Sequence, residues 1–157
     1  MDPDDSNHLF VMLAGEGENL YETKDGGNTW TSVTSLPAGA YSISMIPGTP
    51  SSILAATETG LVRYDIQSGT VQETQLTNEP VYQVLTLPNK EVVIMTESGF
   101  QKSKDFKTWS AINVELNGEM PLGIKSAKED GSRLVILTDR YSVYESSNGG
   151  ENWTKTK

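Results

Sequence analysis

The chain of 157 residues has no cysteine and a single histidine, His8. Without cysteine there are no disulfides, no thiolate metal ligands and no thiol nucleophile. One histidine leaves too little material for a Ser-His-Asp triad or a histidine-based zinc site. Because no apolar run approaches the roughly 18 residues that a membrane span requires, we also expect no membrane insertion. These absences argue against most of the familiar enzyme classes.

Basic residues are scarce, with 12 Lys and Arg against 21 Asp and Glu, which gives a net charge of −9. Such a chain repels polyanions, so we expect no nucleic-acid partner. The first ten residues, MDPDDSNHLF, contain neither the basic nor the apolar stretch of a secretory signal. The length predicts one domain around one hydrophobic core.

Four segments of the chain resemble one another at a regular spacing. Leu20, Leu61, Phe100 and Val143 occupy matching positions, at successive offsets of 41, 39 and 43 residues. A period of about 40 residues is typical of β-propeller blades. Within each unit, short apolar and β-branched runs are separated by Gly, Asn, Asp and Pro, which predicts strands and turns rather than helices.

The second unit predicts four strands, the number in a propeller blade. These strands cover residues 40–46, 53–57, 61–65 and 70–76. The first unit begins after the place of its innermost strand, so we expect 15 strands, one short of four complete blades.

We therefore predict an all-β propeller formed by one domain, residues 1–157. Its four units of roughly 41 residues have the approximate bounds 1–38, 39–78, 79–118 and 119–157. Two architectures remain open, namely a complete small ring and part of a larger propeller whose further blades come from a longer chain.

A short motif recurs after the third strand position of three units. It reads TKDGGNTW from Thr23, SKDFKTW from Ser103 and SSNGGENW from Ser146. Its hydroxyl and carboxylate or amide groups suit hydrogen bonds to the backbone of a tight turn, glycine suits a positive φ, and tryptophan suits packing between blades. The key positions are Thr23, Asp25, Gly27 and Trp30; Ser103, Asp105 and Trp109; and Ser146, Asn148, Gly150 and Trp153.

These motifs resemble the Asp-box, or BNR repeat. The resemblance implies a propeller related to sialidases, xyloglucan-active glycosidases, sortilin-like receptors, a photosystem assembly factor or bacterial surface propellers. Sialidases of this kind bind their substrate with three arginines, one of them in a Phe/Tyr-Arg-Ile-Pro segment. None of the three arginines here, Arg63, Arg133 and Arg140, stands in such a segment, so sialidase activity is disfavoured.

In a propeller, the turns between second and third strands lie on the same face as the links between blades, and the box motifs lie on the opposite face. We call the first of these the link face. It is expected to gather many carboxylates and one basic-aromatic pair, Arg140 and Tyr141. The candidate ligand-binding residues are Glu16, Glu58, Glu97, Asp139, Arg140 and Tyr141. We expect no cofactor, although such carboxylates would suit Ca²⁺; the alternative is that turns of an acidic chain are simply acidic.

The resulting hypothesis is a non-catalytic binding module for a glycan or a protein, located outside the cytoplasm as the resemblance implies. The alternative is a fragment or divergent member of a propeller glycoside hydrolase, sialidase-like or xyloglucanase-like, whose two carboxylates would flank a cleft.

Overall fold

The computed structural model describes residues 5–13, 19–34, 36, 40–46, 52–65, 68, 70–73, 79–127 and 131–157. These ranges hold 15 β-strands, and no helix that could span a membrane was found among them. The strands form four antiparallel sheets in which neighbours in sequence are neighbours in space. The predicted all-β class and the 15 strands are confirmed.

Each sheet is a simple meander. The first contains β1 (Leu9–Met12), β2 (Leu20–Thr23) and β3 (Thr31–Thr34). The second contains β4 (Ser42–Met45), β5 (Ser52–Thr57), β6 (Gly60–Asp65) and β7 (Thr70–Glu73). The third contains β8 (Val81–Thr86), β9 (Val92–Thr96), β10 (Gly99–Ser103) and β11 (Ser110–Ile112). The fourth contains β12 (Pro121–Ser126), β13 (Leu134–Thr138), β14 (Val143–Ser146) and β15 (Thr154–Lys155). We refer to these four sheets with their turns as units 1 to 4.

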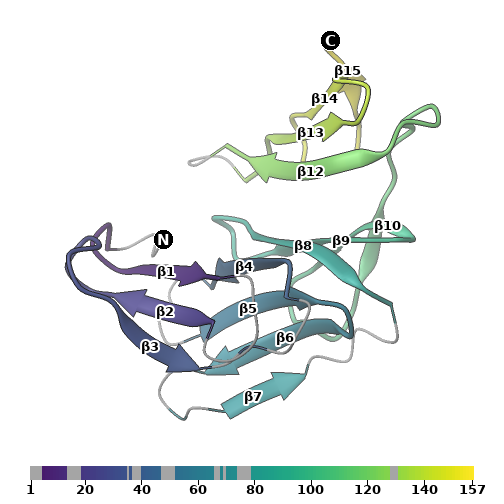
Figure 1. Ribbon diagram of the computed structural model, residues 1–157. Helices are drawn as coiled ribbons and strands as arrows, with labels where there is room; N and C mark the ends of the chain where they lie inside the picture. The colour runs from purple at the N-terminus through teal and green to yellow at the C-terminus, as the bar shows by residue number, and fades with distance from the viewer. Residues whose placement is uncertain are drawn as a thin grey trace.

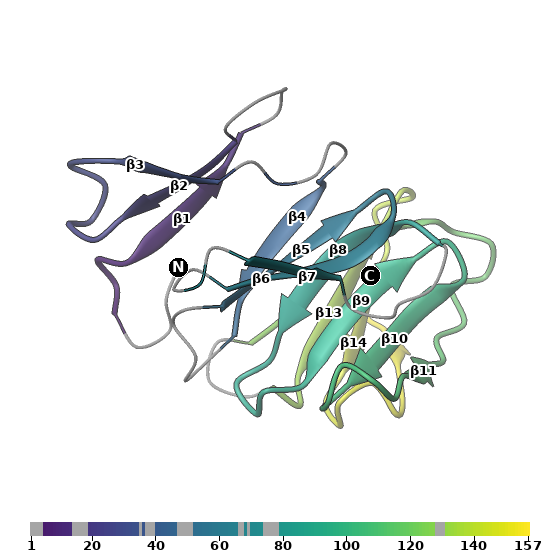
Figure 2. The same cartoon turned by 90° about the horizontal axis from the view of Figure 1, so that it is seen from below.

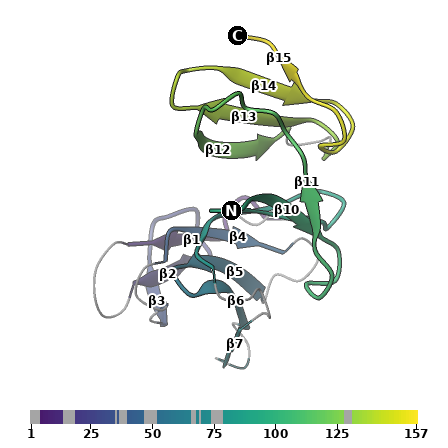
Figure 3. The ribbon, with the colours of Figure 1, turned by 90° about the vertical axis from the view of Figure 1, so that its right-hand side faces the viewer.

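The units follow one another around an open arc (Figures 1 and 2). Three clusters of buried side chains form the core, and each joins two consecutive units. None of these clusters, within the described ranges, joins unit 4 back to unit 1, and the two units stand at different ends of the arc (Figure 3). Of the two architectures left open by the sequence, the structure corresponds to part of a larger propeller.

The middle strands are apolar on both faces because neighbouring units cover both. All six residues of β5 are buried. Ile53 and Ala55 pack toward unit 1, whereas Leu54 and Ala56 pack toward unit 3, as the two-residue period of a strand requires. In unit 4, Leu137 of β13 is 44% exposed, because no described unit covers its outer face.

Polar side chains connect the innermost strands of consecutive units. The Ser42 Oγ accepts a hydrogen bond from the Val84 N–H (3.1 Å) and the Ser44 Oγ accepts one from the Thr86 N–H (3.1 Å). The Gln83 amide accepts from the Ile124 N–H (2.9 Å) and donates to the Ile124 carbonyl (3.0 Å). These side chains satisfy backbone groups that an edge strand would otherwise leave unpaired.

The three motif turns, at residues 23–30, 103–109 and 146–153, share one hydrogen-bond pattern; we call them the box turns. In the first, the Thr23 Oγ1 accepts from the Gly27 N–H (3.0 Å), and Asp25 accepts from the Thr29 N–H (2.9 Å). In the last, Ser146 and Asn148 accept equivalent bonds from the Gly150 and Asn152 N–H groups, both 2.9 Å.

The middle box turn is one residue shorter, and Phe106 takes a positive φ of 61° there in place of glycine. Its tryptophan differs as well. The Trp153 indole N–H donates to the Gly150 carbonyl at 3.1 Å, whereas the buried Trp109 Nε1 has no hydrogen-bond partner among the described residues. The shortened turn thus retains the carboxylate bonds but loses the indole bond.

The sequence predicts that all three box tryptophans pack in the core or between blades, and the structure places two of them between units. Trp109 packs on the core shared by units 2 and 3, and Trp153 on the core shared by units 3 and 4. Trp30 is 41% exposed, because no described unit precedes unit 1 to receive its ring.

Candidate functional site on the link face

The antiparallel order of the strands brings the second-to-third-strand turns to the face where the links enter each unit. Glu58, Glu97 and Asp139 lie in the turns that follow β5, β9 and β13. All three are exposed, as are Arg140 and Tyr141 beside Asp139. Glu16 lies outside the described residues.

Several link-face carboxylates are engaged in holding the links. The Glu79 carboxylate accepts from the Ser98 Oγ (3.0 Å), and Asp139 accepts from the Met120 N–H (2.9 Å). The Glu119 side chain, only 7% exposed, accepts from Thr138, from Ser142 (3.0 Å) and from the Lys155 ammonium (2.9 Å). The hydrogen bond from Lys155 has the largest effect, and together with the bonds from the two hydroxyls it lowers the pKa of Glu119 to about 2.

Other carboxylates remain available. No described residue gives the side chains of Glu97 or Glu115 a hydrogen bond or an ion pair. Glu58 accepts a bond from the Tyr41 hydroxyl at 3.4 Å. Partial desolvation and then the charge of Glu58 raise the pKa of Tyr41. The acidic turns thus divide into carboxylates with a structural role and carboxylates that face solvent.

Exposed apolar side chains also lie on this face, which the sequence reasoning missed. Tyr41, Tyr82 and Leu122 occupy equivalent positions at the start of three innermost strands, and Leu122 is 60% exposed. The Tyr41 and Tyr82 rings approach with centroids 5.7 Å apart. Aligning the inner strands of the repeat would have revealed this series, because all three residues stand at the same place in their units.

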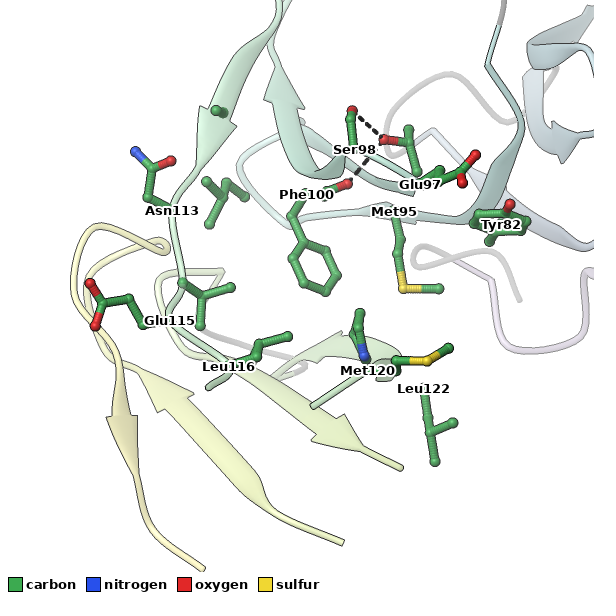
Figure 4. Close-up of a pocket in the computed structure, with 16 residues that line it drawn as sticks. Tyr82, Met95, Glu97, Ser98, Phe100, Asn113, Glu115, Leu116, Met120 and Leu122 are labelled. Carbon is green, nitrogen blue, oxygen red and sulfur yellow. Dashed lines mark hydrogen bonds between the residues drawn. The ribbon is translucent and has the colours of Figure 1, made fainter. Parts of the chain in front are cut away.

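A groove of about 980 Å³ opens between units 3 and 4 next to these side chains. Its walls come from the β9–β10 hairpin, the link at residues 113–120 and the start of β12. In Figure 4, Phe100 and Met95 point into the groove from one side, with Leu116 and Met120 on the other. Glu97 and Glu115 stand at opposite ends of it, with their carboxylates directed away from its centre.

Of the predicted site residues that the structure describes, Glu97 is the one that lines this groove. Asp139 holds the backbone of Met120, which borders it. Glu58 lies beside Tyr41 of unit 2. Arg140 and Tyr141 are not among the lining residues; Tyr141 is 78% exposed and takes a positive φ of 61°.

For a metal ion, no group of three or more His, Cys, Asp or Glu side chains converges within the part of the chain that the structure describes. Glu16 falls outside that part, so Ca²⁺ binding stays a prediction.

Neither a protein-family model nor a curated protein matches the sequence. Among solved structures, the GH74 enzyme of Niastella koreensis aligns with a TM-score of 0.72 at 17% identity, covering 99% of this chain and 28% of that one. YCF48 bound to a D1 peptide aligns with a TM-score of 0.71 at 14% identity, covering 96% and 50%. PorZ, a surface component of the type-IX secretion system of Porphyromonas gingivalis, aligns at 0.69 and 15% identity, covering 98% and 21%.

These neighbours are β-propeller proteins, and the likeness shows that the present chain has the propeller fold. The chain spans 28% of the length of the GH74 enzyme, 50% of that of YCF48 and 21% of that of PorZ. Because a shared fold does not determine function, the function of this chain is inferred from its candidate site and not from its similarity to these proteins.

Proposed function

We propose that this chain is a non-catalytic propeller module whose link face binds a protein or a glycan outside the cytoplasm. The observation that carries the proposal is the groove between units 3 and 4, which is apolar inside and has free carboxylates only at its ends. Pockets of several hundred Å³ lined by apolar side chains with a few polar groups are typical ligand sites.

The box turns support the same proposal in a different way. We infer that they are Asp-boxes that stabilise units 1, 3 and 4, since their hydroxyl and carboxylate or amide groups are engaged in the turns themselves. This leaves the opposite face, with its exposed Tyr82, Met120 and Leu122, for a ligand.

Two features of the structural neighbours favour a binding role outside the cytoplasm. One neighbour was solved with a bound peptide. Others are a bacterial surface component and the extracellular domain of a one-component system from B. thetaiotaomicron. The negative net charge of the chain disfavours nucleic acid as the ligand.

A glycoside hydrolase related to the GH74 neighbours is the second candidate, because Glu97 and Glu115 line the same groove. Hydrolysis requires two carboxylates that face one glycosidic bond from opposite sides. The carboxylates of Glu97 and Glu115 are directed away from the centre of the groove (Figure 4), and this arrangement favours binding over hydrolysis.

The two candidates are separated by measuring binding and turnover on the same preparation. Xyloglucan oligosaccharides and immobilised glycan and peptide arrays serve as probes. We expect binding without release of reducing ends, and we expect the charge-introducing variant Met120→Lys to weaken it. Release of reducing ends that disappears in Glu97→Gln would assign the groove to a hydrolase instead.

A further inference from the structure

We propose that the groove between units 3 and 4 binds an extended peptide segment of a partner protein, in which a large apolar residue is followed or preceded closely by Lys or Arg. The inference rests on the proposed binding function and specifies its ligand. Three independent features of the groove support it, namely its apolar floor, the charge at its ends and an unpaired stretch of backbone.

The floor of the groove suits an inserted side chain better than a sugar ring. Phe100, Met95, Leu116 and Met120 surround the centre of the cavity (Figure 4). Met120 is 67% exposed, so an apolar residue of a ligand would cover surface that water now contacts. Flexible methionine side chains adapt to apolar partners of varied shape, and a volume of about 980 Å³ exceeds that of one side chain.

The charge of the groove has one sign. Among its sixteen lining residues, the charged ones are Glu97 and Glu115 alone. Neither carboxylate has a hydrogen-bond or ion-pair partner among the described residues, whereas Glu79 and Glu119 on the same face are both engaged. Two free carboxylates at the ends of an apolar groove complement basic residues that flank an apolar anchor.

The backbone of the link offers donors to a peptide. β11 ends at Ile112, and residues 113–116 belong to no strand. The N–H groups of Val114 and Glu115 have no hydrogen-bond acceptor among the described residues. Backbone N–H groups without a partner can pair with the carbonyls of an extended peptide, which supplies affinity while pockets supply specificity.

The test is selection of the 157-residue chain against a phage-displayed library of random nine-residue peptides. We expect enrichment of peptides that combine a large apolar residue with Lys or Arg within three positions. One enriched peptide, made synthetically, is then measured by fluorescence anisotropy against the original protein and its variants. Met120→Lys should weaken binding by about tenfold or more, because it places a charge at the apolar anchor.

Glu97→Lys and Glu115→Lys should each weaken binding by about three- to tenfold, with a loss of the salt dependence. Glu151→Lys makes the same charge change on the exposed box turn of the opposite face and should leave binding unchanged. Circular dichroism of each variant checks that the fold is retained, and Glu97→Gln should give an intermediate loss.

Selection of acidic peptides, no enrichment at all, or enriched peptides whose binding is unchanged by Met120→Lys and Glu97→Lys would overturn the inference. Glycan binding that Met120→Lys weakens would also overturn it, while leaving the proposed binding function intact. Turnover of xyloglucan would instead contradict the proposed function itself.

Discussion

Replacing Gly150 by alanine is expected to destabilise the junction of units 3 and 4 strongly. Gly150 has a φ of +87°, and a Cβ added there would lie 2.8 Å from Ile112 Cγ2 and 3.5 Å from Leu134 Cδ1. Both neighbours belong to the buried core shared by these units. The left-handed backbone costs about 1–2 kcal/mol for a non-glycine residue, and overpacking a closed core adds about 1–3 kcal/mol. The sum, about 2–5 kcal/mol, is a large part of the stability of an ordinary domain.

Gly118→Ala is the matched control, because Gly118 has a φ of +76° but no atom within 4 Å of the added Cβ. It should carry only the backbone cost of about 1–2 kcal/mol. Urea unfolding followed by tryptophan fluorescence measures the free energy of unfolding of both variants. Equal losses for Gly150→Ala and Gly118→Ala would refute the argument that the box turn is packed against the core of the preceding unit.

Two further predictions concern the box turns and the link. Trp153→Phe should cost about 2 kcal/mol more than Trp109→Phe in urea unfolding. The first variant loses an indole hydrogen bond, whereas the second removes a buried donor that has no partner among the described residues; equal costs would contradict this. Hydrogen bonds from the side chain and the N–H of Thr29 lower the pKa of Asp25 to about 2. In the shortened turn, hydrogen bonds from the N–H groups of Thr108 and Lys107 lower the pKa of Asp105 to about 2 as well. A carboxyl group whose pKa is lower in the folded than in the unfolded protein stabilises the fold fully above the unfolded pKa, and this stabilisation is lost as the pH falls through the folded pKa. The contributions of Asp25, Asp105 and Glu119 should therefore disappear as the pH falls from about 5 to 2. Asp25→Asn should therefore flatten the pH dependence of the unfolding midpoint over that range, and an unchanged slope would count against the assignment.

The architecture could be predicted from the sequence because its determinants are local. Each unit repeats apolar strand runs and turn residues at nearly constant spacing, and short antiparallel connections leave few alternatives to a meander. The box turns were predictable for the same reason, since the bonds of Thr23 and Asp25 span only two to four residues. The exposure of Trp30 was not, because it depends on whether another unit packs against unit 1.

The candidate site could be predicted only in part, because it depends on contacts between distant residues. The sequence predicts that many carboxylates gather on the link face but does not separate their roles. Glu119 is engaged by Lys155, 36 residues away, whereas Glu97 has no such partner among the described residues. The groove itself arises where the link at residues 113–120 passes between two sheets, a feature that no motif marks.

The central claim, that the groove between units 3 and 4 is the binding site, is tested most directly by hydrogen–deuterium exchange of the 157-residue chain with and without an enriched peptide. Binding in the groove should slow exchange at residues 96–99 and 113–120 and leave the box turns at residues 23–30, 103–109 and 146–153 unchanged. Slower exchange confined to the box turns, with residues 113–120 unaffected, would contradict the claim.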